Sequence, residues 1–175
     1  MHTGRPDRSE AGEYYFTYID RIQEDDICAV LEAQHVSTLG ALRAVTDAAS
    51  KHRYAPGKWS LREVLGHLND TERLFVLRAF WFARGFDSPL PSFDQNVAMA
   101  ASAADARSWS SLIEEFDAVR RGSITFFRSL PAEAWMRRGV ASGSPFTVRA
   151  LAYVGAGHVD HHMVIVRDRY LASLA

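Results

Sequence analysis

Two histidines near the C-terminal end of the sequence, His158 and His162, lie four residues apart in a segment with helical periodicity. Residues four apart on an α-helix project from the same face, so both imidazoles can reach one metal ion. That face also carries Leu151 and Ile165, so the histidines interrupt a stripe that otherwise faces the core. The pair predicts an inward-facing metal site, although an H-x-x-x-H spacing is common by chance and needs a further ligand.

A third histidine, His67, lies on the inward-facing line of a second helical segment. Burying neutral imidazoles in a helical protein is unfavourable unless each finds a hydrogen bond or a metal. Three histidine ligands from two facing helices would leave the fourth position of a tetrahedral metal open for water, as in catalytic sites. His161 is an alternative to His162, because a spacing of three from His158 also places two side chains on one face.

The candidate catalytic residue is Asp70, which follows His67 by three residues and lies about 60° around the helix from it. Its carboxylate could orient an imidazole or accept a proton from a reacting group. An exposed or interhelical salt bridge explains the same residue equally well.

Other residues with reactive side chains have simpler interpretations. Tyr14, Tyr15 and Tyr18 could line the mouth of the site, but we favour packing of the N-terminal segment on the rest of the protein. The one cysteine, Cys28, is interpreted as a small core residue, because no histidine or acid lies at a matching position to activate it.

Four segments with helical periodicity position these residues. The second has the clearest start, since Ser60 is the expected N-cap, Glu63 is its capping-box partner and Gly85 is a natural stop. The four predicted helices span about 27–45, 61–84, 108–129 and 148–174. Period-two alternation of useful length is missing from the sequence, so no strands are predicted.

These segments predict an all-α fold, an antiparallel four-helix bundle. Residues 86–107 hold prolines and cap-type residues, which favours a long crossover between the second and third helices. Residues 1–24 are predicted to be a lead-in that packs on the bundle, and residues 25–175 a single domain. The stretch 74–83 is too apolar for one core-facing stripe, so a dimer interface or the N-terminal segment is expected to cover its excess face.

The composition limits the classes of function. The 175 residues carry 20 Lys+Arg against 21 Asp+Glu, a formal net charge of −1, so no nucleic-acid partner is expected. A chain of this length builds a core without a disulfide or a structural metal, so a bound metal would serve chemistry. A single cysteine, a polar N-terminus and the absence of any apolar run near the ~18 residues of a membrane span predict a cytoplasmic protein without a membrane partner.

The motifs resemble the DinB/YfiT-like superfamily. The resemblance lies in GKWSLREVLGHLNDTER at 57–73 and GHVDHH at 157–162, a first histidine after a Trp-Ser helix start and an H-x-x-x-H pair on the last helix. The tyrosine-rich segment 14–19, the Ala-Arg-Gly at 83–85 and the Arg-Tyr at 169–170 extend it over nearly the whole chain.

This resemblance implies a four-helix bundle that holds one divalent metal on His67, His158 and His162, and commonly a homodimer. It favours His162 over His161 as the third ligand. The metal is often zinc or nickel, and iron and manganese are also compatible with imidazole ligands. Family activities include thiol S-transfer, maleylpyruvate isomerisation and metal-dependent hydrolysis, so the partners expected are a small-molecule substrate and a low-molecular-weight thiol.

Two hypotheses of function follow. The first is a metal-dependent enzyme, a hydrolase or a thiol S-transferase, that uses the open coordination position. The second is a protein without catalytic activity, in which the metal is structural or the bundle is a stress-related binding module. Fold and metal follow from the resemblance more safely than the substrate, because one fold supports many reactions.

Overall fold

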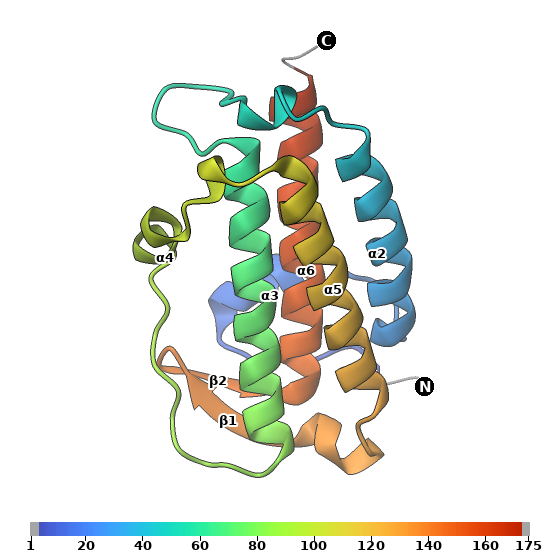
Figure 1. Cartoon of the computed structure of the whole chain (residues 1–175). Coiled ribbons are helices and arrows are strands. Elements are labelled where there is room, and N and C mark those ends of the chain that lie inside the picture. The colour runs from blue at the N-terminus through green and yellow to red at the C-terminus, as the bar shows by residue number, and fades with distance from the viewer. Residues whose placement is uncertain (1–3, 173–175) are drawn as a thin grey trace.

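The computed structural model describes residues 4–172, and four long helices dominate them (Figure 1). Helices α2 and α6 run in one direction and α3 and α5 in the other, so α3 is antiparallel to α6 but parallel to α5. The bundle and its crossover are as predicted. The helices span Ile27–Arg43 (α2), Leu61–Ala83 (α3), Trp109–Arg128 (α5) and Val148–Ile165 (α6).

Polar caps begin these helices where the sequence places them. The Ser60 hydroxyl accepts from the Glu63 backbone N–H, and the Glu63 carboxylate accepts from the Ser60 backbone N–H, which completes the predicted capping box. Gly85 follows the end of α3 with a φ of +83°, a conformation that favours glycine. The side chains that cap the other three helices are those of Asp26, Ser108 and Thr147.

The last predicted helix changes its hydrogen bonding before it ends. After Ile165 the backbone continues as a π-helical segment, Val166–Leu171. The predicted end at Leu174 lies outside the described residues.

Two short elements correct the prediction from sequence. The crossover contains a helix, Gln95–Ser102 (α4), because the Asp94 carboxylate accepts from two backbone N–H groups of its first turn. A hairpin joins Arg138–Ala141 (β1) to Ser144–Thr147 (β2), although no strands were expected. Its turn is Ser142-Gly143, both with positive φ, and four-residue strands are too short to show an alternating pattern.

The N-terminal segment packs against α6. It forms a turn at Glu13–Tyr15 (η1) and a short helix, Phe16–Ile19 (α1). A Cβ atom added to Gly157 would lie 2.0 Å from the Tyr18 carbonyl oxygen, so only glycine allows this contact. The segment that contains Tyr18 therefore lies directly beside Gly157, the neighbour of His158 in the sequence.

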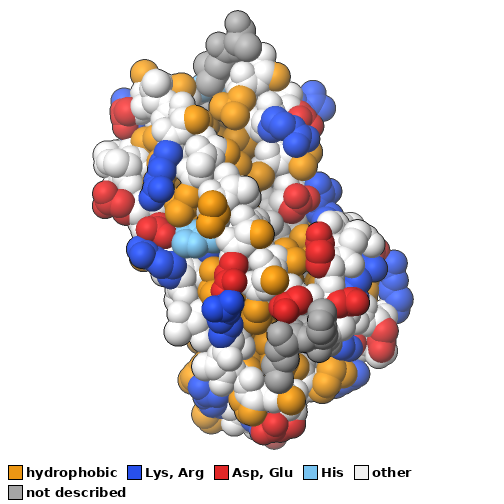
Figure 2. Space-filling view, turned by 90° about the vertical axis from the view of Figure 1, so that its right-hand side faces the viewer, with side chains coloured by type: hydrophobic (Ala, Val, Ile, Leu, Met, Phe, Trp, Pro, Cys, Tyr) orange, Lys and Arg blue, Asp and Glu red, His pale blue; other side chains and the backbone are white. Residues whose placement is uncertain are grey.

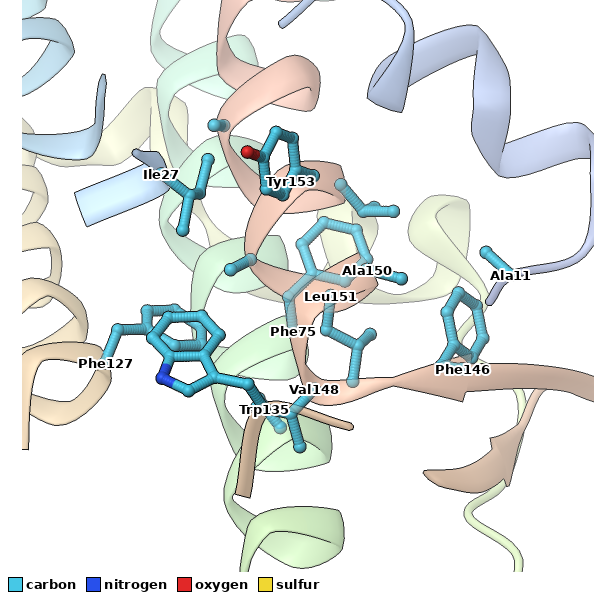
Figure 3. Close-up of a cluster of buried hydrophobic side chains, with 14 of the residues drawn as sticks. Ala11, Ile27, Phe75, Phe127, Trp135, Phe146, Val148, Ala150, Leu151 and Tyr153 are labelled. Carbon is cyan, nitrogen blue, oxygen red and sulfur yellow. The ribbon is translucent and has the colours of Figure 1, made fainter. Parts of the chain in front are cut away.

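The half of the bundle next to the β-hairpin forms one hydrophobic cluster (Figure 3). Tyr153 and Leu151 of α6 lie at its centre, Phe75 reaches it from α3, and Trp135 stacks on Phe127 below α5. Cys28 is buried in the same cluster, which confirms its interpretation as a core residue. Within residues 4–172, each helix is too short or too polar to cross a membrane.

The apolar stretch 74–83 of α3 is only partly covered. Leu77 is 51% exposed and Phe80 is 39% exposed, and they border a groove of about 410 Å³ between α3 and α5. The N-terminal segment packs on α6 instead, so it does not cover these two side chains. The alternative cover, a homodimer interface, stays a prediction.

Candidate metal centre

Three histidines from two helices converge inside the bundle. His67 of α3 meets His158 and His162 of α6, and one nitrogen of each ring lies within 4.8 Å of the other two. The Nε2 atoms of His67 and His158 are 3.1 Å apart. A tetrahedral ion with bonds of 2.0–2.1 Å holds its ligand nitrogens about 3.3 Å apart, so this donor set fits such an ion.

Burial keeps the three imidazoles neutral. His67 is 3% exposed and His158 is 5% exposed. Burial lowers the pKa of His67 to about 4 and that of His162 to about 3, and the neighbouring His67 contributes to the second shift. The pKa of His158 is also lowered, by burial first and then by the other histidines. Neutral imidazole is the form that binds metal, so the cluster is ready for a ligand role near neutral pH.

Thr71 sets the orientation of the His158 ring. Its hydroxyl donates to the His67 carbonyl at 2.7 Å and lies 3.4 Å from His158 Nδ1. Because the hydroxyl proton is already used, Thr71 Oγ1 can only accept from a protonated Nδ1. That tautomer leaves the lone pair on Nε2, the atom that faces His67.

Thr71→Val is expected to lower metal affinity by about 10-fold to 100-fold, the usual effect of losing an outer partner of a ligating histidine. Competition with a chromophoric chelator measures this change. Thr71→Ser keeps the hydroxyl and is the matched control. Equal affinities for the Val and Ser variants would rule out this orienting role.

A second prediction concerns the pH dependence of the metal-free protein. The unfolded histidines titrate near pH 6.5, whereas His67 and His162 titrate at about 4 and about 3 when folded. Between these values only the unfolded chain takes up protons, so the free energy of unfolding decreases as pH falls from about 6.5 toward 4. Each of the two histidines contributes at most about 1.4 kcal/mol per pH unit to this slope.

Urea unfolding of chelator-treated protein between pH 7.5 and 5 measures that slope. His162→Gln should flatten it. If the free energy of unfolding of His162→Gln depends on pH as steeply as that of the wild type, His162 is not a source of the slope.

The other candidate residues lie elsewhere. His161 is not one of the three converging histidines, and its ring lies 5.7 Å from that of Tyr18. Asp70 lies 3.8 Å from Arg73 and lines a separate cavity with Glu115, which none of the three histidines lines. This geometry therefore gives no support for Asp70 as a general base.

Histidine side chains reach the surface on one face of the molecule, among hydrophobic and charged neighbours (Figure 2).

Two cavities with different lining residues border the cluster. One, of about 270 Å³, is lined by His162 and by Trp59, whose ring lies 5.1 Å from that of His67. The other, of about 150 Å³, is lined by His67 and His158. Each cavity therefore borders at least one of the three converging histidines.

The tyrosines take part in the second cavity. Tyr14, Tyr15 and Tyr18 all line it, and the Tyr18 ring is 5.2 Å from that of His158. The packing favoured from the sequence is present, but the same side chains also form the wall of the site, because Gly157 lets their segment approach α6 closely.

Sequence reasoning missed a further residue in this cavity, Arg78. It follows His67 by eleven residues, three helical turns, so it lies on the same face of α3. This spacing was a usable signal, but arginine on a helix is usually a surface residue.

Solved structures with this fold carry names that refer to metal and thiol chemistry. YfiT from Bacillus subtilis, a probable metal-dependent hydrolase with an unusual four-helix bundle topology, matches with a TM-score of 0.73 and 17% identity, over 93% of this chain and 89% of that one. A mycothiol-dependent maleylpyruvate isomerase matches with a TM-score of 0.69 and 12% identity, over 83% of this chain and 61% of the isomerase. At these identities the likeness shows the fold alone.

Sequence comparison gives the family. No curated protein matches the sequence significantly. A model of the DinB superfamily matches residues 31–166, which include all three converging histidines. With the bundle, its crossover and the histidine cluster in agreement, the chain belongs to the DinB superfamily.

Proposed function

We propose that this protein is a metal-dependent enzyme that acts on a small molecule, as a hydrolase or as a thiol S-transferase. His67, His158 and His162 are its metal ligands, for zinc or nickel first and iron or manganese as alternatives. The observation that supports this proposal is the convergence of three neutral imidazoles, two of them buried and that of His162 half-buried, without a fourth protein ligand among residues 4–172. When bound, a divalent ion supplies Lewis acidity, which lowers the pKa of a bound water or thiol and polarises a carbonyl.

The protein's own residues would provide the rest of the site. Thr71 holds His158 in the tautomer that ligates, and the fixed ring positions require little rearrangement when the metal binds. The aromatic walls formed by Tyr18 and Trp59 limit the access of bulk water to the cluster. A substrate that enters either cavity can therefore place its reacting group beside the ligand nitrogens.

The two cavities are compatible with both reactions. A transferase needs room for a thiol and for an electrophile at once, and two separate cavities that border the cluster meet that need. The similar fold of a mycothiol-dependent isomerase supports a thiol cofactor, and that of a probable metal-dependent hydrolase supports hydrolysis.

Metal analysis of the purified protein is the first test, and one equivalent of a divalent metal per chain is expected. A stoichiometric absence of zinc, nickel, iron and manganese would overturn the site. Activity is then measured on esters and amides without thiol, and on electrophiles with glutathione, bacillithiol or mycothiol. Turnover that needs a thiol identifies the transferase, and turnover without one identifies the hydrolase.

A protein without catalytic activity is the alternative. The cluster joins α3 to α6, so a metal there could also stabilise the bundle. In that case chelation lowers the melting temperature sharply, and no exchangeable water is detected on the metal.

We also propose that the protein forms a homodimer. Sedimentation velocity tests it, and a monomer at micromolar concentration would contradict it.

A further inference from the structure

Arg78 is a buried cation in the cavity that reaches the histidine cluster. Its residue is 2% exposed, and it lines the same cavity as His67 and His158. The arginine enters from α3 three turns beyond His67, so the residues that line the cavity extend along this helix from His67 to Arg78.

Arg78 differs from the other buried arginines in residues 4–172 because it has no carboxylate partner. Arg62 forms an ion pair with Asp47 at 2.7 Å, and Arg120 forms one with Glu72 at 3.1 Å. No Asp or Glu among the described residues lies within 4.0 Å of the Arg78 guanidinium nitrogens. A buried charge without a counter-ion is costly, so its environment is incomplete without an anion.

The neutral partners of Arg78 leave part of the guanidinium unused. Nη2 donates to the Pro91 carbonyl at 3.1 Å and to Ser142 Oγ at 2.7 Å, and Tyr15 interacts with the side chain. Nε is buried and has no hydrogen-bond partner. Burial lowers the pKa of Arg78, but a guanidinium stays protonated in proteins.

The cavity between the cation and the histidines has an aromatic wall and a small volume. Its volume is about 150 Å³, enough for a body of about the size of benzene. The aromatic side chains that line it include Tyr14, Tyr18, Phe75 and Phe93.

We propose that Arg78 binds the carboxylate of a small organic acid, whose apolar part lies among the aromatic side chains and whose opposite end faces the histidines. Guanidinium and carboxylate form charge-assisted hydrogen bonds, which supply the missing counter-charge. As a statement about substrate class this rests on the proposed function, but binding of the anion itself does not require the metal.

Benzoate and its neutral isostere benzamide are the probes, and NMR titration of the metal-loaded protein measures their affinities. Benzoate should bind about tenfold more tightly than benzamide, since a hydrogen bond to a charged group contributes about 1.5–3 kcal/mol. Arg78→Gln should remove this preference and leave benzamide affinity unchanged. Arg84→Gln removes a charge from the exposed end of the same helix and should keep the preference.

The variant Ser142→Ala distinguishes anion binding by Arg78 from a purely structural role of this residue. This variant removes a bond between α3 and the hairpin but keeps the guanidinium, so the preference for benzoate should persist. Loss of the preference in Ser142→Ala to the same extent as in Arg78→Gln would assign Arg78 to holding the hairpin and overturn the proposal.

Three other results would also overturn it. They are benzoate affinity no greater than that of benzamide in the wild type, a preference that survives in Arg78→Gln, and a preference lost on chelation, which would place the carboxylate on the metal. A protein that lacks metal yet prefers benzoate through Arg78 would contradict the proposed function and support this inference.

Discussion

Replacing His67 with alanine is expected to abolish stoichiometric metal binding while the bundle stays folded. His67 is the only one of the three converging histidines that comes from α3, so its loss leaves two ligands on one helix. Metal affinity should fall by more than about 100-fold, since loss of an outer partner alone costs up to that factor. Removing a buried imidazole also relieves an unfavourable desolvation, so the helical content should change little.

Metal content by mass spectrometry and helicity by circular dichroism measure this result. His161→Ala is the matched control, because His161 neighbours a proposed ligand but does not belong to the cluster. It should retain one metal per chain. Stoichiometric metal in His67→Ala, or its loss in His161→Ala, would show that the ligand set is different.

The parts of the fold that follow from local chemistry could be predicted from the sequence. The capping box of Ser60 and Glu63 depends on residues three apart, and the sequence shows it directly. The convergence of His158 with His162 depends on one turn of helix, and the position of His67 on an inward face completed the cluster.

The remaining features depend on contacts between distant segments. α3 and α5 are parallel because the crossover runs back to the end of the bundle at which α3 begins. Helical periodicity does not show in which direction a helix runs. The cavity wall required Gly157 to admit the Tyr18 segment, a contact across 139 residues of sequence. Arg78 was not predicted as a site residue, because its partners come from the crossover and the hairpin, and helical periodicity does not show how these segments pack on α3.

Arg120 is the residue whose replacement is expected to cost the most stability. It is fully buried, and its Nη2 lies 3.1 Å from the Glu72 carboxylate, which is itself 5% exposed. Its Nη1 donates to Gln34, whose amide donates to the Ala156 carbonyl of α6. The network therefore joins α2, α3, α5 and α6 close to the histidine cluster.

Arg120→Met is expected to lower the free energy of unfolding by about 3–5 kcal/mol, because it leaves the Glu72 carboxylate buried without its partner. That is a large share of the roughly 5–15 kcal/mol that stabilises a typical domain. Urea unfolding of the single and double variants measures the effect. The double variant Glu72→Met/Arg120→Met should recover most of the loss, since it removes both charges together.

The neighbouring Arg121 provides the control for this prediction. It pairs with Asp117 at 2.8 Å, but its side chain is 66% exposed. Water and salt screen that pair, so Arg121→Met should cost less than about 1 kcal/mol. Similar losses for the two methionine variants would mean that water reaches the Glu72 carboxylate, and a double variant as unstable as Arg120→Met would place the cost in the lost packing of Arg120 and its bond to Gln34.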